Sequence, residues 1–132
     1  MQLRSTASWW LKLRRGPSAE VRRQIDRQVA AVARLKVRIL TFFDDNYPVR
    51  LKAIPDPPPL LYVSGELLPQ DAVGVAIVGG RRATPAGRVV TEGIAKDLAE
   101  CGVTIVSGLA RGIDAAAHRG ALAGKGRTIA VL

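Results

Sequence analysis

From residue 72 onward, short apolar runs alternate with segments of helical periodicity. The continuous apolar run 73–78 is typical of a strand buried on both faces of a parallel sheet. Parallel strands need long crossover connections, so the alternation predicts strand, helix, strand, helix and strand in one α/β sheet, with right-handed crossovers. The pattern is half of a Rossmann-type sheet. The predicted strands are 73–78, 103–106 and 127–132, and the predicted helices are 85–101 and 114–123.

The first of these helices carries its own start and stop signals. Thr84 is a predicted N-cap, Pro85 fits the first helical position, and Gly102 fits the residue after the helix end. Cys101 is the only cysteine, which excludes an internal disulfide and a Cys-based zinc site, and we expect it to pack as a small hydrophobe. The predicted buried face of this helix consists of Val90, Ile94, Leu98 and Cys101.

Two turns rich in glycine and arginine follow the first two strands. The first is Gly79-Gly80-Arg81-Arg82, and the second runs from Ser107-Gly108 to Arg111-Gly112. Because the carboxyl ends of parallel strands meet at one edge of a sheet, we expect both turns to lie side by side, with backbone N–H groups facing a ligand. Glycine lets an anion approach the backbone, and guanidinium groups match phosphate geometry. The predicted ligand is a run of phosphates.

Other interpretations of these residues stay open at this point. The glycines of the first turn also permit a tight turn whose arginines reach solvent. Ser107 either donates its hydroxyl to a phosphate or caps a local turn, and Asp114 is expected to be the N-cap of the second helix. His118, the only histidine, is expected to be packed and hydrogen-bonded rather than catalytic or metal-binding. The predicted phosphate-binding residues are Gly79, Gly80, Arg81, Arg82, Ser107, Gly108, Arg111 and Gly112, with no catalytic or metal residue.

The first 35 residues form a basic segment that is predicted to be helical. Ten Lys or Arg residues against Glu20 and Asp26 give residues 1–40 a net charge of +8. Ser18 is the predicted N-cap of a helix over 19–35 with one apolar stripe. Further predictions are poorly structured or locally helical chain over 1–17, strands at 37–43 and 60–63, a short helix at 47–54 and a loop at 66–71.

Composition limits the class of protein. The chain has 132 residues and a net charge of +9, with a pI near 10.8, which is compatible with binding nucleic acid or an anionic surface. No apolar run approaches the roughly 20 residues of a membrane span, and no signal peptide is recognisable, so a cytoplasmic protein is expected. Neither the P-loop nor the Gly-x-Gly-x-x-Gly spacing is present, so no nucleotide cofactor is predicted.

At these residues the chain resembles the DNA-processing protein A family (DprA, also called Smf). The resemblance covers residues 36–132, and its most specific part is the Ser-Gly-Leu-Ala-Arg-Gly-Ile-Asp-Ala-Ala-Ala-His stretch. It implies an extended Rossmann-like domain that binds single-stranded DNA and loads the RecA recombinase during natural transformation. It also implies a self-associating cytoplasmic protein that is not an enzyme. The matching segments are 43–48, 56–65, 76–87, 107–122 and 127–132.

The resemblance carries over residue by residue. The family's Gly-Ser-Arg turn falls on Gly79, Gly80 and Arg81, and Gly80 replaces a small hydroxyl residue. The usual N-terminal helical domain is not recognisable, so the expected division is a basic helical segment over 1–35 and a Rossmann-like domain over 36–132. The family's Gly-rich turn after the third strand, and the basic and dimer-forming elements beyond it, are expected past Leu132. We therefore expect a partial domain, truncated after its third core strand.

Three functions remain open at this stage. The leading hypothesis is a sequence-independent binder of single-stranded DNA that works with a RecA-type recombinase. The first alternative is an enzyme of related Rossmann-like fold that cleaves a nucleotide phosphoribosyl group. The second is a fragment that is inactive by itself. Paired carboxylates and a Pro-Gly-Gly-x-Gly-Thr loop, which the enzyme would be expected to carry, are not found near the turns.

Overall fold

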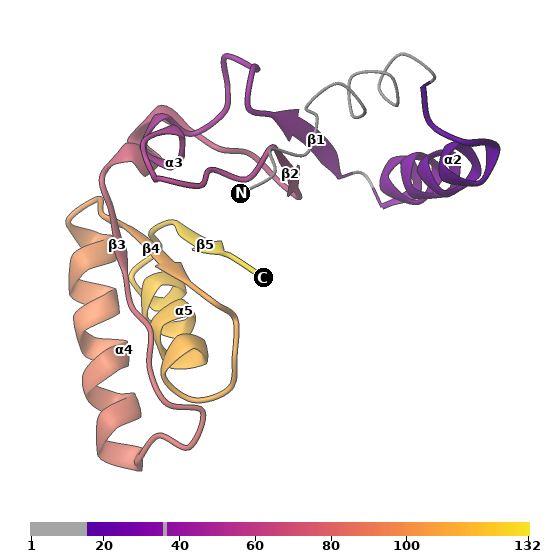
Figure 1. Cartoon of the computed structure of the whole chain (residues 1–132). Helices are drawn as coiled ribbons and strands as arrows, with labels where there is room; N and C mark the ends of the chain where they lie inside the picture. The colour runs from indigo at the N-terminus through magenta and orange to yellow at the C-terminus, as the bar shows by residue number, and fades with distance from the viewer. Residues whose placement is uncertain (1–15, 36) are drawn as a thin grey trace, which may run out of the picture. The chain divides into compact units, whose positions relative to one another are not determined.

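A computed structural model describes residues 16–35 and 37–132, shown as a ribbon in Figure 1. The prediction for 1–17 falls largely on residues 1–15, which lie outside the described residues. The chain divides into two compact units, and the division falls between Glu66 and Leu67. We call them the first and the second unit. The predicted boundary between residues 35 and 36 stays a prediction.

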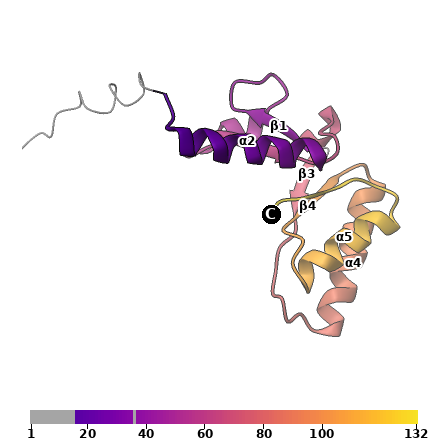
Figure 2. The same ribbon diagram turned by 90° about the vertical axis from the view of Figure 1, so that its right-hand side faces the viewer.

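The first unit combines one long helix with a two-stranded sheet. Helix α2 (Ala19–Arg34) begins as predicted, because the Ser18 side chain accepts a hydrogen bond from the Val21 N–H group. No residue of α2 is buried, and Figure 2 shows the helix along its length. Tyr47 is fully buried, and its hydroxyl donates to the Pro58 carbonyl at 2.7 Å. The remaining elements are β1 (Arg38–Thr41), α3 (Val49–Lys52) and β2 (Leu60–Val63), with β1 and β2 antiparallel.

The second unit is a three-stranded parallel sheet in the order β3-β4-β5, with a helix in each crossover. This confirms the predicted alternation and the α/β fold class. The predicted loop over 66–71 is partly wrong, because its end forms a short 3-10 helix, η1. The elements are η1 (Pro69–Ala72), β3 (Gly74–Ala76), α4 (Pro85–Glu100), β4 (Thr104–Ser107), α5 (Ile113–Ala123) and β5 (Thr128–Ala130).

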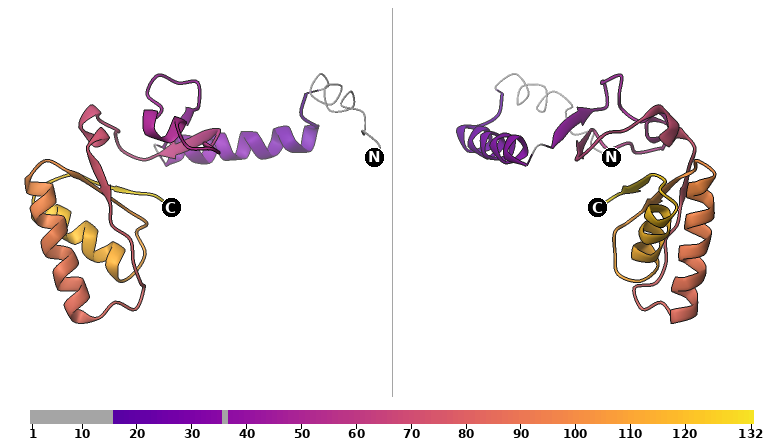
Figure 3. Two further views of the ribbon diagram at one scale, coloured as in Figure 1. Left: turned by 60° about the vertical axis from the view of Figure 1, so that its left-hand side comes forward. Right: turned by 180° about the vertical axis from the view of Figure 1, so that it is seen from behind.

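Helices α4 and α5 lie side by side against the face of β4 that carries Ile105, as the two views of Figure 3 show. They approach closely because small residues face each other. A Cβ atom at Gly120 would lie 2.3 Å from the Glu92 carbonyl oxygen of α4. The buried residues of this contact are Ala95, Ala99, Ile105, Ala117 and Ala121.

The predicted buried face of α4 is therefore wrong for Val90, Ile94 and Cys101, whereas Leu98 is partly buried and packs against the core. Val90 and Ile94 are 59% and 51% exposed, and Cys101 is exposed at the helix end. The alanines one position further along the helix make the contact instead, because only small side chains permit the close approach of α5. The predicted ends of α4 are confirmed: Thr84 accepts from the Gly87 N–H group, and Gly102 has a φ of 81°.

The prediction that 73–78 is a strand buried on both faces is also wrong. Strand β3 has only three residues, and Val75 and Val78 are 41% and 71% exposed. In the described part of the chain, β3 is an edge strand that pairs only with β4. One strand edge and part of its surface are consequently left open to solvent.

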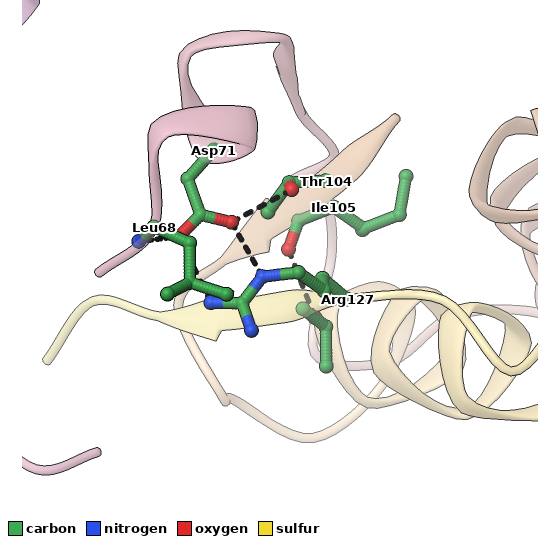
Figure 4. A network of polar contacts seen from close by, with 6 residues as sticks. Leu68, Asp71, Thr104, Ile105 and Arg127 are labelled. Carbon is green, nitrogen blue, oxygen red and sulfur yellow. Dashed lines mark hydrogen bonds and ion pairs between the residues drawn. The ribbon is translucent and has the colours of Figure 1, made fainter. Parts of the chain in front are cut away.

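The amino ends of the strands are joined by a polar network centred on Asp71 (Figure 4). Arg127 donates to both carboxylate oxygens, at 2.7 and 2.9 Å, and Thr104 donates its hydroxyl at 2.9 Å. The Leu68 N–H group adds a further bond at 2.8 Å. Chiefly because of the Arg127 hydrogen bonds, the pKa of Asp71 is lowered to about 2. The network thus links η1 to the beginnings of β4 and β5.

Candidate nucleic-acid interface

The two glycine- and arginine-rich loops lie together at the carboxyl ends of β3 and β4, beside the beginnings of α4 and α5 (Figure 1). The Ile113 N–H group donates to the Gly80 carbonyl at 3.4 Å, which joins the second loop directly to the first. The prediction that both loops occupy one edge of the sheet is confirmed by this contact.

Two glycines make this close contact possible. Gly112 has a φ of 93°, and a Cβ atom there would lie 2.3 Å from the Gly80 carbonyl oxygen. A Cβ atom at Gly79 would lie 2.7 Å from Cγ1 of Ile113. Gly80 is different, because a Cβ atom there would meet nothing within 4 Å. Gly79 and Gly112 are therefore required by loop packing, whereas the space beside Gly80 is open.

The sequence predicted Asp114 as the N-cap of α5, and this prediction is wrong. The helix begins after Gly112, and Asp114 lies in its first turn with only 6% of its surface exposed. One carboxylate oxygen accepts from the Gly79 N–H group at 3.3 Å, and the other accepts from the Ala110 N–H group at 3.4 Å. The carboxylate thus bridges the two loops.

Ser107 lies at the end of β4 and is buried. Its hydroxyl donates to the Ile77 carbonyl at 2.7 Å, so its single hydrogen is used between the strands. A phosphate contact by Ser107 stays a prediction, and only its oxygen lone pairs remain for other partners. Donors to a phosphate would then come from other groups of the two loops, such as the Arg111 side chain.

An open hollow of about 600 Å³ lies over the two loops; we call it the arginine hollow. The side chains of Arg81, Arg82 and Arg111 are exposed. Within residues 16–35 and 37–132, none of these three guanidinium groups forms an ion pair or a hydrogen bond. They therefore present uncompensated positive charge to solvent. The lining residues of the arginine hollow are Arg81, Arg82, Gly108, Ala110 and Arg111.

His118 is packed and hydrogen-bonded, as predicted. It is 7% exposed, and its Nδ1 lies 2.6 Å from the Thr128 hydroxyl oxygen. Because that hydroxyl donates to the Ile105 carbonyl at 2.9 Å, Nδ1 must be the donor to Thr128. Across the described residues, no group of three or more His, Cys, Asp or Glu side chains is placed to hold a metal ion.

Sequence reasoning missed three contributors to this site. Ala110 lines the hollow and donates its N–H group to Asp114, and Ile113 packs against Gly79. Leu109 lies between the lining residues Gly108 and Ala110; it adopts a φ of 57°, which is uncommon for leucine, and is 56% exposed. All three residues lie in the stretch that carries the family resemblance, but a backbone donor and an unusual φ leave little trace in a sequence, so these roles were not predicted.

Comparison with known proteins identifies the family. Residues 38–132 match the family model described as DNA recombination-mediator protein A. The chain belongs to this family. It is 48% identical over 99 residues to Protein Smf of Synechocystis sp., and 36% identical over 110 residues to the DNA processing protein DprA of Bacillus subtilis. These matches cover 72% and 83% of this chain.

Solved structures of family members share the fold. The X-ray structure of DprA from Streptococcus pneumoniae matches with a TM-score of 0.64 and 40% identity, over 73% of this chain and 34% of that chain. DprA from Helicobacter pylori, described with its single-stranded DNA binding mode, matches with a TM-score of 0.60 and 36% identity, over 73% of this chain and 43% of that chain. The chain spans 25% and 37% of the length of the Synechocystis and Bacillus relatives.

The described residues contain no helix of the length and apolar character needed to cross a membrane.

Proposed function

We propose that this chain binds single-stranded DNA by placing consecutive backbone phosphates in the arginine hollow. The observation that carries the proposal is the gathering of three exposed guanidinium groups without an acidic partner among the described residues. Guanidinium forks bind phosphate oxygens bidentately, and an unpaired arginine loses no internal ion pair when it does so. The printed description of the Helicobacter pylori relative adds support for a single-stranded DNA ligand.

The same geometry favours recognition that is independent of base sequence. Phosphate contacts position a strand but carry no sequence information directly. The hollow is lined by arginine, glycine and alanine, so its side chains supply positive charge for phosphates and no aromatic ring for base stacking. The expected ligand is therefore the sugar–phosphate backbone of any sequence.

A binding role is preferred to an enzymatic one. A phosphoribosyl-cleaving enzyme of this fold would need a carboxylate or another reactive group directed at its substrate. The carboxylate closest to the loops, Asp114, is buried and accepts two backbone hydrogen bonds. Incubation with nucleoside monophosphates should release no free base, and release of base would favour the enzyme.

The proposal extends to the recombination step. The family is described as a recombination mediator, and we propose that the bound strand is passed in the cytoplasm to a RecA-type recombinase during natural transformation. Self-association, as a homodimer, belongs to the same proposal. A faster assembly of recombinase filaments on single strands coated with single-strand-binding protein would support the transfer, and an unchanged rate would contradict it.

The deciding experiment is charge reversal in the hollow. Arg81→Glu should weaken binding of fluorescein-labelled oligo(dT) by about 10- to 100-fold at low salt, because one charge-assisted contact is lost and a repulsive charge is added. Fluorescence anisotropy measures this loss. Arg50→Glu is the matched control, since Arg50 is an exposed arginine of α3 in the first unit.

The control separates a specific site from total charge. Both variants lower the net charge equally, but Arg50 does not line the hollow, so Arg50→Glu should change the affinity only slightly. If Arg81→Glu binds as tightly as the unmodified protein, or if both variants lose the same affinity, the hollow is not the binding site.

A further inference from the structure

Asp114 combines two properties that rarely occur together. It is a buried acid, yet none of the described basic side chains pairs with it. Its two oxygens are divided between two loops: Oδ1 faces the Gly79 N–H group and Oδ2 faces the Ala110 N–H group. A buried charge is tolerated only when it is hydrogen-bonded, so this arrangement ties the loops together.

We propose that Asp114 is a positioning residue, whose carboxylate holds the two loops at the spacing that lets one DNA strand contact the arginines of both. This inference rests on the proposed function of the arginine hollow. Two hydrogen bonds of similar length join the loops: the Ile113 N–H group donates to the Gly80 carbonyl at 3.4 Å, and the Gly79 N–H group donates to Asp114 Oδ1 at 3.3 Å. The second oxygen of Asp114 accepts from the Ala110 N–H group and so ties the same carboxylate to the second loop. Arg81 and Arg82 belong to one loop and Arg111 to the other.

The choice of acid follows from acceptor chemistry. An ionised carboxylate has two oxygens that both accept, whereas the amide of asparagine has one oxygen and an NH2 group that only donates. Asp114→Asn can therefore keep only one of the two loop bonds and places a donor against the other N–H group. Asp114 lies in the first turn of α5, where the helix dipole stabilises its negative charge. This placement limits the repulsion between the carboxylate and the DNA phosphates.

The proposal predicts the sign of a binding change. Asp114→Asn removes a negative charge from beneath the hollow, and electrostatics alone would tighten DNA binding. Loss of loop spacing would weaken it, because Arg111 would no longer engage the strand together with Arg81. The two explanations thus predict opposite signs for one substitution of nearly unchanged shape.

The test compares Asp114→Asn with Asp97→Asn in the full 132-residue chain, by titration of fluorescein-labelled oligo(dT) at several NaCl concentrations. Asp97 is an exposed acid of α4 and serves as the matched control. Asp114→Asn should weaken binding by about tenfold and reduce the salt slope by about 0.7, the contribution of one phosphate. Asp97→Asn should leave both values unchanged.

The salt slope separates positioning from stability, because partial unfolding lowers the active fraction without changing the number of phosphates neutralised. Unchanged or tighter binding by Asp114→Asn overturns the inference, while failure of the unmodified chain to bind DNA overturns the proposed function and the inference with it. Weaker binding with an unchanged salt slope would mean that Asp114 contributes only to the stability of the fold, and this result also overturns the inference.

A second measurement needs no variant and applies if Asp114→Asn does not fold. In the unmodified chain, amide hydrogen exchange should show Gly79 and Ala110 protected before DNA is added. The amides of Gly80 and Arg81 should gain protection only with DNA. Free exchange at Gly79 and Ala110 in the absence of DNA would overturn the inference.

Discussion

The two ends of the parallel sheet in the second unit use charged side chains in opposite ways. At the amino ends, Arg127 pairs with Asp71 at 2.7 Å, and the charges neutralise each other. At the carboxyl ends, Asp114 accepts only backbone N–H groups, and the arginines of the hollow have no acidic partner in the described parts of the chain. The first end is an internally satisfied support. The second end keeps positive charge for a ligand.

The comparison shows how a strongly basic protein can combine a stable sheet with an anion site. A carboxylate beside an arginine stabilises the fold, but it would compete with a phosphate for the same guanidinium group. Directing Asp114 at the backbone avoids this competition, because its charge is satisfied without using a side-chain cation. Substitutions at one end should therefore leave the function of the other end unchanged.

The largest effect is expected from Gly112→Ala, which disturbs the carboxyl end. The new Cβ atom would lie 2.3 Å from the Gly80 carbonyl oxygen, at a φ of 93° that alanine strongly disfavours. We expect a loss of about 3 kcal/mol or more in the free energy of unfolding, together with loss of DNA binding. Urea unfolding followed by circular dichroism measures the first, and anisotropy measures the second.

Gly80→Ala is the matched control for this substitution. Its Cβ atom would meet nothing within 4 Å, so the free energy of unfolding should change by no more than about 0.5 kcal/mol. Equal stability of the two variants would contradict the loop contact at Gly112.

The next effect concerns pH and the amino end. Hydrogen bonds from Arg127 lower the pKa of Asp71 from 3.8 to about 2, so the folded state favours the ionised form. The resulting stabilisation is present above the unfolded-state pKa and is lost as the pH falls through the folded-state value. We expect on the order of 1–2 kcal/mol to disappear between about pH 5 and pH 2.

Asp71→Asn tests this assignment. The variant should lose stability at neutral pH and show a shallower fall in acid, as measured by urea unfolding at several pH values. Its oligo(dT) affinity at neutral pH should match that of the unmodified protein, because Asp71 lies at the opposite end of the strands from the hollow. An identical acid dependence in both proteins would show that another group controls it.

Except for η1, the sequence was sufficient to predict the order of the described elements, and it also predicted the meeting of the two loops. Alternating apolar and helical segments fix the parallel sheet, and strand topology then brings Gly79 and Gly112 to one edge. The caps Ser18 and Thr84 were also readable, because capping depends on residues close in sequence. Local sequence signals therefore predicted the helix caps, and strand topology predicted that the two loops meet.

Sequence reasoning failed where a contact depends on the distance between elements. The valines of α4 have the right periodicity, but helix α5 approaches so closely that Ala95 and Ala99 form the contact and Val90 remains exposed. Asp114 was predicted to be an N-cap, yet one of its oxygens accepts from the Gly79 N–H group, 35 residues away in the chain. Hydropathy and capping rules contain no information about such tertiary distances.

The smallest effect is expected from Gly80→Ser, which tests whether a phosphate binds beside this turn at the carboxyl end of the sheet. The family resemblance implies a small hydroxyl residue where this chain has Gly80, and the structure leaves open space there. An added hydroxyl should donate one more hydrogen bond to a phosphate and tighten oligo(dT) binding about two- to threefold, with stability unchanged. Gly80→Ala supplies the carbon without the hydroxyl, so equal affinities of the serine and alanine variants would show that no phosphate lies within reach of this turn.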